Sequence, residues 1–141
     1  MPPKNKQMKK DIIPPEVKNV HIAVIKEKND AGELVWNVYL VNEQKRTLEN
    51  VLVTSTGYKI DDKGIKQNSS TLRHFLENVP AQSTKKIEPI IEDVFGLNNE
   101  YFVTYFSPEG MAEKQFVFLP DSIQELNFKD VPFLKKKGVM I

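Results

Sequence analysis

The amino-acid sequence predicts an all-β fold, an antiparallel β-sandwich of about seven strands followed by a short C-terminal helix. From Val17 onward, apolar residues recur at every second position, which is typical of strands that bury one face. The apolar stretches are short, and Gly, Pro, Asn and Asp separate them at regular intervals. A parallel sheet would need crossover helices, and the sequence contains no long amphipathic segment that could form them.

The predicted strands follow one another along the chain after its first residues. The first two lie near 20–25 and 34–41, and the Asn-Asp-Ala-Gly stretch at 29–32 supplies the turn between them. Trp36 lies on the apolar face of the second strand, so we expect it in the core. Further strands are expected near residues 51–58, 71–77, 85–91, 101–106 and 114–119.

The last third of the chain carries the clearest turn and helix signals. The Ser-Pro-Glu-Gly sequence at 107–110 predicts a hairpin, because Pro fits the second position of a type I turn and Gly the left-handed position after it. Ser122 and Glu125 match a capping box, which predicts a helix of one or two turns. Residues 135–141 are expected to form a last strand at a sheet edge.

The chain is expected to form one domain preceded by a tail. Residues 1–16 contain two Pro-Pro pairs among lysines and polar residues, which predicts a flexible basic tail, and residues 17–141 are expected to form the single β-sandwich domain. The absence of cysteine excludes disulfides, thiolate zinc sites and thiol catalysis. The start lacks the apolar stretch of a secretory signal, and no apolar run is long enough to cross a bilayer. We therefore expect a cytoplasmic protein with no membrane contact.

Basic residues are concentrated at the two ends of the chain. The formal net charge is +1, and the body between the ends is close to neutral, which offers no strong field for nucleic acid. The lysines at the ends are Lys4, Lys6, Lys9, Lys10, Lys135, Lys136 and Lys137. If the termini lie together, these lysines could hold phosphate groups in a salt-sensitive complex. The favoured alternative is that they are solvated and keep the protein soluble.

Aromatic residues in the strand near 101–106 supply a candidate protein interface. Tyr101 and Tyr105 alternate with Phe102 and Phe106, so one of the two pairs must point outward from the sheet. An outward row of Phe would form an exposed apolar patch and a contact surface. The favoured alternative is that a helix or the C-terminal segment covers this face. The apolar residues available in that segment are Ile123, Leu126, Phe128 and Phe133.

No motif in the chain indicates catalysis, a cofactor or a metal. His21 and His74 are the only histidines, and they lack the spacing of metal ligands. The six glycines are scattered singly, which excludes a Walker loop and a Rossmann fingerprint. We therefore predict that the protein is not an enzyme. A pocket holding His21 or His74 beside a carboxylate with a strongly shifted pKa would favour the opposite interpretation.

Three segments together form one pattern. A strand ends in Asn, a second strand follows after a polar turn, and later a proline marks the bend before a further strand. The three segments are Trp-Asn-Val-Tyr-Leu-Val-Asn-Glu at 36–43, Leu-Glu-Asn-Val-Leu-Val at 48–53, and Asn-Val-Pro-Ala-Gln-Ser-Thr-Lys-Lys-Ile at 78–87. In this respect about residues 18–119 resemble the immunoglobulin-like and fibronectin type III-like domains of many bacterial proteins. Ala81 and Gln82 replace the Gly that usually follows the bend, and the paired cysteines of antibody domains are missing. The resemblance implies a binding or spacer role, since this fold fixes no activity.

The function expected from the sequence is a non-catalytic protein-interaction or structural module without cofactors. An edge strand offers unpaired N–H and C=O groups, so either an edge strand or a sheet face would bind another protein or a second copy. The alternative is an RNA- or translation-associated accessory protein that binds through its lysine-rich termini.

Overall fold

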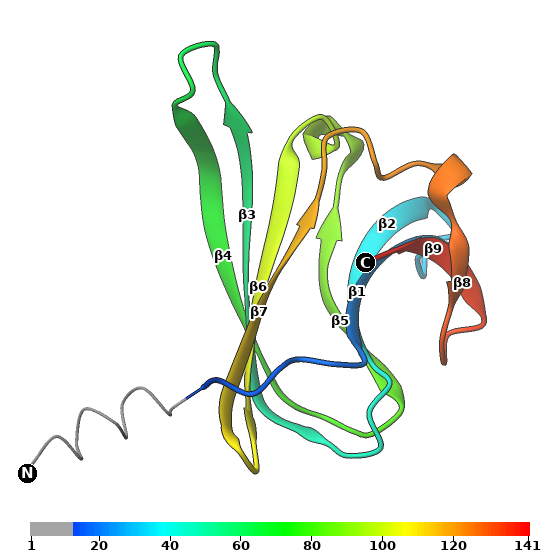
Figure 1. The fold of residues 1–141 in the computed structure, drawn as a ribbon. Coiled ribbons are helices and arrows are strands. Elements are labelled where there is room, and N and C mark those ends of the chain that lie inside the picture. The colour runs from blue at the N-terminus through cyan, green and yellow to red at the C-terminus, as the bar shows by residue number, and fades with distance from the viewer. Residues whose placement is uncertain (1–12) are drawn as a thin grey trace, which may run out of the picture.

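The structure, a computed structural model, describes residues 13–141 and consists mainly of β-strands (Figure 1). Residues 1–12, which make up most of the predicted tail at 1–16, lie outside the described residues. The described strands are β1 (Val20–Lys28), β2 (Leu34–Asn42), β3 (Leu48–Ile60), β4 (Lys66–Val79), β5 (Ser83–Ile90), β6 (Asn98–Ser107), β7 (Gly110–Phe118), β8 (Lys129–Val131) and β9 (Lys136–Met140).

The strands form two antiparallel sheets that face each other, which confirms the predicted all-β sandwich (Figure 1). One sheet has the strand order β5-β2-β1-β9-β8, and the other has the order β4-β3-β6-β7. The β3–β4 hairpin extends beyond the rest of the four-stranded sheet, and the five-stranded sheet is strongly curved. Strand order could not be predicted from the sequence, because several of the paired strands lie far apart along the chain.

Every second side chain along the strands faces the other sheet, and these side chains form the core. Val24 of β1 and Val38 of β2 are paired across the two strands, and both are fully buried. Trp36 is buried in the same core, as expected, and its ring meets Phe95 and Phe128 edge-on at centroid distances of 5.1 and 5.9 Å. Edge-on contacts of this kind add to the stabilisation that burial of the rings provides.

A second, smaller apolar cluster lies on the outer face of the five-stranded sheet. Ala23 and Ile25 of β1 pack there with Val41 of β2 and Val131 of β8. The strand β1 is therefore buried on both faces, which explains why apolar residues follow one another in it without polar alternation.

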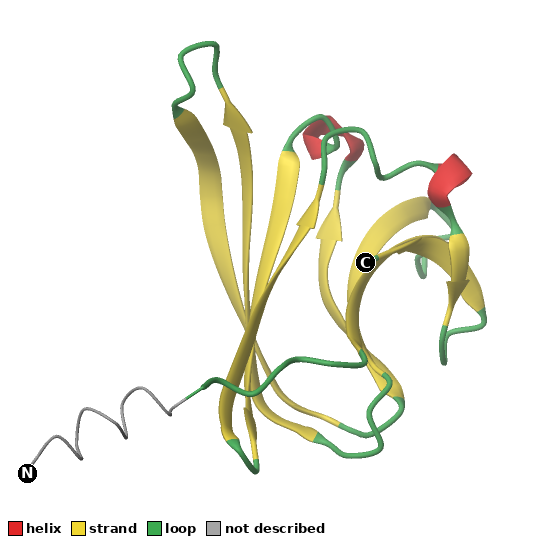
Figure 2. Cartoon of the chain, viewed as in Figure 1, coloured by secondary structure: helices red, strands yellow, loops and turns green. Residues whose placement is uncertain are grey.

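The C-terminal segment differs from the prediction. The hairpin at 107–110 is present, but the helix expected after Ser122 is not: this segment forms a 3-10 turn at Glu125–Asn127 (Figure 2). The Ser122 hydroxyl donates to the carbonyl of Leu119, so it does not cap the amides that follow it. Gln124 has extended backbone angles, which prevents the next residues from continuing a helix started at Ser122.

The last strand is present, although its position was predicted incorrectly. β9 lies between β1 and β8 rather than at an edge of the sheet. The edge is formed by β8, a strand that the sequence pattern did not reveal because it is three residues long. Two or three residues are too few to establish a period of two.

Candidate functional site

Strand β6 separates its two aromatic pairs between the inside and the outside of the sandwich. Tyr101 and Tyr105 are buried in the core, and Val103 between them is buried as well. Phe102 and Phe106 lie on the outer face of the four-stranded sheet, where Phe102 is half-buried and Phe106 is 45% exposed. The pair that points outward is therefore the Phe pair.

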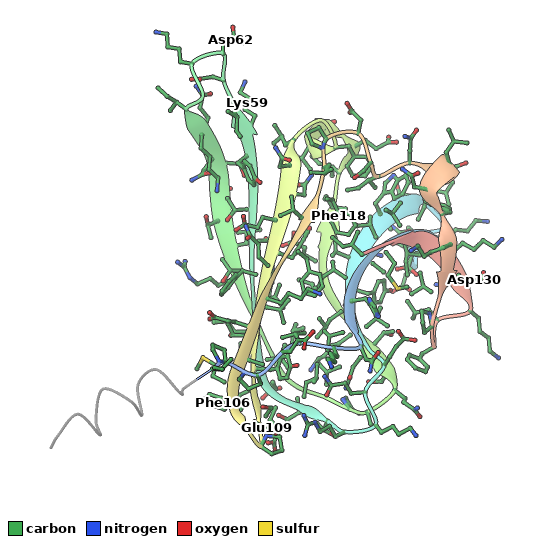
Figure 3. The ribbon with its side chains drawn as sticks, viewed as in Figure 1. Lys59, Asp62, Phe106, Glu109, Phe118 and Asp130 are labelled. Atoms are coloured by element: carbon green, nitrogen blue, oxygen red, sulfur yellow. The ribbon has the colours of Figure 1, made fainter. Side chains whose placement is uncertain are left out.

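Neighbouring strands add apolar side chains to the same face and form a shallow depression, which we call the outer groove. Leu52 of β3 pairs with Phe75 of β4, and Phe106 pairs with Met111 of β7. All four side chains are exposed to solvent. The groove has a volume of about 320 Å³ and is lined by Asn50, Leu52, Phe75, Thr104, Tyr105, Phe106 and Met111. Figure 3 shows Phe106 on the side of the molecule that faces away from the five-stranded sheet.

The C-terminal segment does not cover the outer groove, contrary to the favoured expectation. Ile123 and Phe128 pack instead into the core between the sheets. Leu126 is 90% exposed and Phe133 is about half exposed, and neither lines the groove. The groove is therefore open in the part of the chain that the structure describes.

Of the two Phe residues that point outward, Phe106 lines the groove and Phe102 does not, and the other apolar residues of the groove were not predicted. Leu52 lies between Val51 and Val53, which occupy the core, and Phe75 precedes the buried Leu76. The available signal was that these strands carry apolar residues on both faces, whereas a one-sided strand would carry polar residues on its outer face.

A polar cluster between the two sheets is centred on a carboxylate that the sequence did not reveal. Glu88 of β5 reaches toward three strands of the opposite sheet, and its side chain is only 12% exposed. Its Oε1 lies 2.6 Å from Nε2 of His74 and accepts a 2.9 Å hydrogen bond from the Ser55 hydroxyl. Its Oε2 accepts a 3.0 Å hydrogen bond from the Tyr101 hydroxyl. The cluster therefore ties the two sheets together.

The arrangement around Glu88 differs from that of a nucleophilic centre. In a hydrolase triad the serine hydroxyl donates to the histidine, and the carboxylate lies behind the histidine. Here the carboxylate is in the middle, and Ser55 and His74 both contact it directly. Burial and the nearby charge of Glu88 raise the pKa of Tyr101, so this phenol stays protonated and donates. A cleft of about 230 Å³ adjoins Ser55, Glu88 and Tyr101, but the geometry supports a structural role for the cluster.

The second histidine also contacts a single carboxylate. His21 Nε2 lies 2.8 Å from Oε2 of Glu43, and both side chains are about one-third exposed. Across residues 13–141, no group of three or more His, Asp or Glu side chains is arranged to hold a metal ion. Each histidine therefore belongs to a local pair.

A second buried carboxylate binds one of the lysines considered for phosphate binding. The Glu27 side chain is 8% exposed, accepts hydrogen bonds from Asn37 Nδ2 (2.7 Å) and the Tyr39 hydroxyl (2.6 Å), and pairs with the Lys136 ammonium. Burial alone would raise the pKa of Glu27, but the bonds from Lys136, Tyr39 and Asn37 together lower it. Burial and the bond to Glu27 raise the pKa of Tyr39 to about 12. Lys136 therefore already has a partner within the domain.

The start of the described chain and the lysine-rich C-terminal segment lie apart. Lys135 and Lys137 are exposed in the β8–β9 segment. Figure 1 shows that the first described residues and the β8–β9 turn lie on opposite sides of the molecule. The remaining lysines of the predicted phosphate site, Lys4, Lys6, Lys9 and Lys10, lie outside the described residues.

Comparison with known proteins identifies no family. No protein-family model matches the chain, and a search of the curated proteins finds no match. In residues 13–141 no helix combines the length and apolar composition needed to span a membrane. The geometry of the two sheets is therefore the basis for distinguishing a protein-interaction module from an RNA-binding protein.

Proposed function

We propose that this domain is a non-catalytic protein-interaction module that binds its partner through the outer groove. The observation that carries the proposal is a strip of apolar side chains on a sheet face, formed by Leu52, Phe75, Phe106 and Met111, which no described segment covers. Burial of one such side chain contributes about 1.5–3 kcal/mol, so a partner that covered the strip would gain substantial affinity. Contiguous apolar patches on soluble proteins are commonly sites of protein contact.

The sheet face is a better candidate than the edges formed by β4, β5 and β8. The Lys85 ammonium binds the Leu76 carbonyl of the edge strand β4, Pro89 lies in the edge strand β5, and the edge strand β8 is only three residues long. Charged side chains, prolines and short strands at an edge hinder the addition of a further strand. These features favour docking on the face over β-augmentation at these edges.

The immunoglobulin-like character of the fold is part of the same proposal. The two facing antiparallel sheets support it, and so does the short hairpin that connects β6 to β7. A binding role on an exposed sheet face agrees with the role that the resemblance implies.

The alternative, RNA binding through the lysine-rich termini, has less support. Lys136 is paired with Glu27, and the first described residues lie on the opposite side of the molecule from the β8–β9 turn. This alternative predicts RNA binding that falls steeply between about 50 and 200 mM salt and disappears when residues 1–11 are deleted. RNA binding that survives the deletion unchanged would reject it.

A photoreactive amino acid in the groove tests the proposed function. Phe106 is replaced by p-benzoylphenylalanine, and illumination of cells that make the protein is expected to join it to one defined protein. The same amino acid at Leu126, which is 90% exposed but outside the groove, is the matched control. Phe75→Asp in the crosslinking chain is expected to reduce the adduct at least tenfold, because it places a charge within the apolar strip.

Two results would contradict the proposal. One is the same set of adducts from positions 106 and 126, which would indicate random collisions. The other is an adduct at position 106 that Phe75→Asp leaves unchanged, because a partner seated in the groove must contact both side chains.

A further inference from the structure

The turn between β8 and β9 carries an exposed aromatic residue in a conformation that bulky residues rarely adopt. Phe133 has a φ of 68° and Lys135 a φ of 54°, in the left-handed region that normally favours glycine. Leu134 packs into the second apolar cluster and fixes the turn to the sheet, while Phe133 stays 49% exposed. The turn is therefore fixed to the sheet and keeps an apolar side chain on the surface. Backbone strain of this kind is concentrated at functional sites.

The same turn is positively charged. Lys135 and Lys137 follow Phe133 and are exposed, and within residues 13–141 neither forms an ion pair. Asp130 lies opposite Lys137 in the β8–β9 ladder and offsets part of this charge. Lys136 is held by Glu27 and does not add to the free charge. The turn thus presents an aromatic side chain next to basic side chains.

The rim of the outer groove carries the opposite charge. Glu49 pairs with Phe106, and Glu113 pairs with Thr104, so both carboxylates lie on the outer face beside the groove. Neither carboxylate forms an ion pair with a described residue. Arg73 lies on the same face of β4 and offsets part of the negative charge. The groove is therefore an apolar depression with an acidic rim, which matches the composition of the β8–β9 turn.

We infer that the outer groove receives the β8–β9 turn of a second copy of this chain, an inference that rests on the proposed function of the groove. The Phe133 ring enters the groove, and Lys135 and Lys137 face Glu49 and Glu113 at its rim. The aromatic anchor supplies most of the affinity. The charges fix the orientation and disfavour partners without a basic flank.

The positions of the two surfaces determine the kind of assembly. In Figure 3, Phe106 marks the side of the groove and Asp130 the side of the turn, and these lie on opposite sides of the molecule. One chain therefore cannot fill its own groove. The contact is head-to-tail, and each added copy leaves one free groove and one free turn. Association is expected to continue past a dimer as the concentration rises, and to weaken with salt.

Sedimentation velocity on the full chain tests the inference. The average mass of the wild-type protein is expected to rise past that of a dimer with increasing concentration. The groove variant Phe75→Asp and the turn variant Phe133→Asp are each expected to weaken association at least tenfold, the equivalent of about 1.4 kcal/mol. An equimolar mixture of the two is expected to stop at a dimer, because only one intact groove and one intact turn remain. Leu126→Asp, exposed outside both surfaces, is expected to associate like the wild type.

Charge reversal gives a second set of variants that leaves the apolar residues in place. The chain with Glu49→Lys and Glu113→Lys, and the chain with Lys135→Glu and Lys137→Glu, are each expected to lose self-association. Mixing the two chains is expected to restore association past a dimer, because the basic groove of one meets the acidic turn of the other and the acidic groove meets the basic turn.

Three results would overturn the inference. They are a wild-type chain that stays monomeric at millimolar concentration, association that neither set of variants weakens, and mixtures in which the two variant chains do not associate with each other. The crosslinking experiment separates this failure from failure of the proposed function. A monomeric wild type that still gives an adduct with a different protein at position 106 keeps the groove as a docking surface and rejects the second copy as its occupant.

Discussion

Glu27 and Glu88 show how single residues organise the two faces of the five-stranded sheet. Glu88 lies between the sheets, whereas Glu27 lies on the outer face, and each buried carboxylate has three partners. A buried charge is tolerated only when hydrogen bonds and opposite charges replace the water that it loses. Both clusters therefore stabilise the fold, and each depends on its carboxylate as the common acceptor.

Removing the carboxylate of Glu88 is expected to destabilise the protein. Glu88→Ala leaves the hydroxyls of Ser55 and Tyr101 without their acceptor and opens a cavity between the sheets. We expect the free energy of unfolding to fall by about 3 kcal/mol, measured by urea denaturation at pH 7. Glu92→Ala, at an exposed position in the following turn, is the control and should change the free energy of unfolding by less than about 0.5 kcal/mol. Equal effects of the two substitutions would mean that the cluster contributes nothing to stability.

The lowered pKa of Glu27 predicts the sign of one pH effect. A carboxyl group whose pKa is lower in the folded than in the unfolded state stabilises the fold above the ordinary value of 4.5, and this stabilisation is lost as the pH falls through the folded pKa. Glu27→Gln is therefore expected to lose less stability than the wild type between pH 7 and pH 3. Urea midpoints at both pH values provide the measurement. Glu16→Gln, at a side chain 77% exposed, should keep the wild-type difference, and an unchanged difference for Glu27→Gln would contradict the prediction.

At the scale of the strands, β9 depends on a glycine that allows close approach to β1. A Cβ atom on Gly138 would lie 2.4 Å from the carbonyl oxygen of Val24, a distance that real structures do not show. The contact involves backbone on both strands, so no side-chain rotation can relieve it. Gly138 pairs with Ile25 in the ladder between β9 and β1, and this pairing holds the C-terminal segment in the sheet.

Gly138→Ala is expected to separate β9 from β1 locally and to lower the free energy of unfolding by about 1–3 kcal/mol. Gly96→Ala is the matched control, because the nearest atom to its added Cβ would be a side-chain oxygen at 3.9 Å. The measurement is the denaturation midpoint of each variant, together with amide exchange in β9. Identical midpoints for the two alanine variants would show that the strands separate without cost.

The pattern of residues along single strands determined which elements could be predicted from the sequence. Apolar residues at every second position were enough to place the strands from β1 to β7 and to predict that Trp36 lies in the core. This pattern failed for Glu88, because β2 and β5 shift register so that Val38 faces Glu88 while the next pair joins Tyr39 to Lys86. Ile87 has no partner in this ladder and forms a β-bulge. Ile87 and Glu88, although adjacent in the strand, therefore both point toward the core between the sheets. A bulge depends on the partner strand, and a single strand's pattern cannot reveal it.

The candidate site was predictable only in part for a related reason. Alternation showed that either the Phe pair or the Tyr pair of β6 must point outward, but the choice depends on which face meets the other sheet. The groove gathers residues from four strands whose order the sequence did not specify. Phe75 and Met111 become its neighbours only through the ladders β4-β3-β6-β7.

At the scale of the whole molecule, the end of the described chain completes the sheet that its first strand begins. Met140 pairs with Ala23, and Ile141 exchanges two backbone hydrogen bonds with Ile22. β8 pairs only with β9 among the described strands, so β9 also holds β8 in place. The second apolar cluster, which includes Val131 of β8, therefore forms only when the C-terminal strand is present.

Deletion of residues 136–141 is expected to have an effect larger than the loss of a single strand. It detaches β8, exposes Ala23 and Ile25, and leaves Glu27 without its lysine. Since domains of this size are stable by about 5–15 kcal/mol, losing about 5 kcal/mol of burial and pairing would remove at least a third of the free energy of unfolding and move the urea midpoint to a much lower concentration. Urea denaturation followed by circular dichroism tests this, and Lys137→Ala, which removes an exposed side chain from the same strand, should retain the wild-type transition. A sharp transition at the wild-type midpoint after the deletion would show that the sandwich closes without β9, and that the β8–β9 turn is an appendage rather than part of the fold.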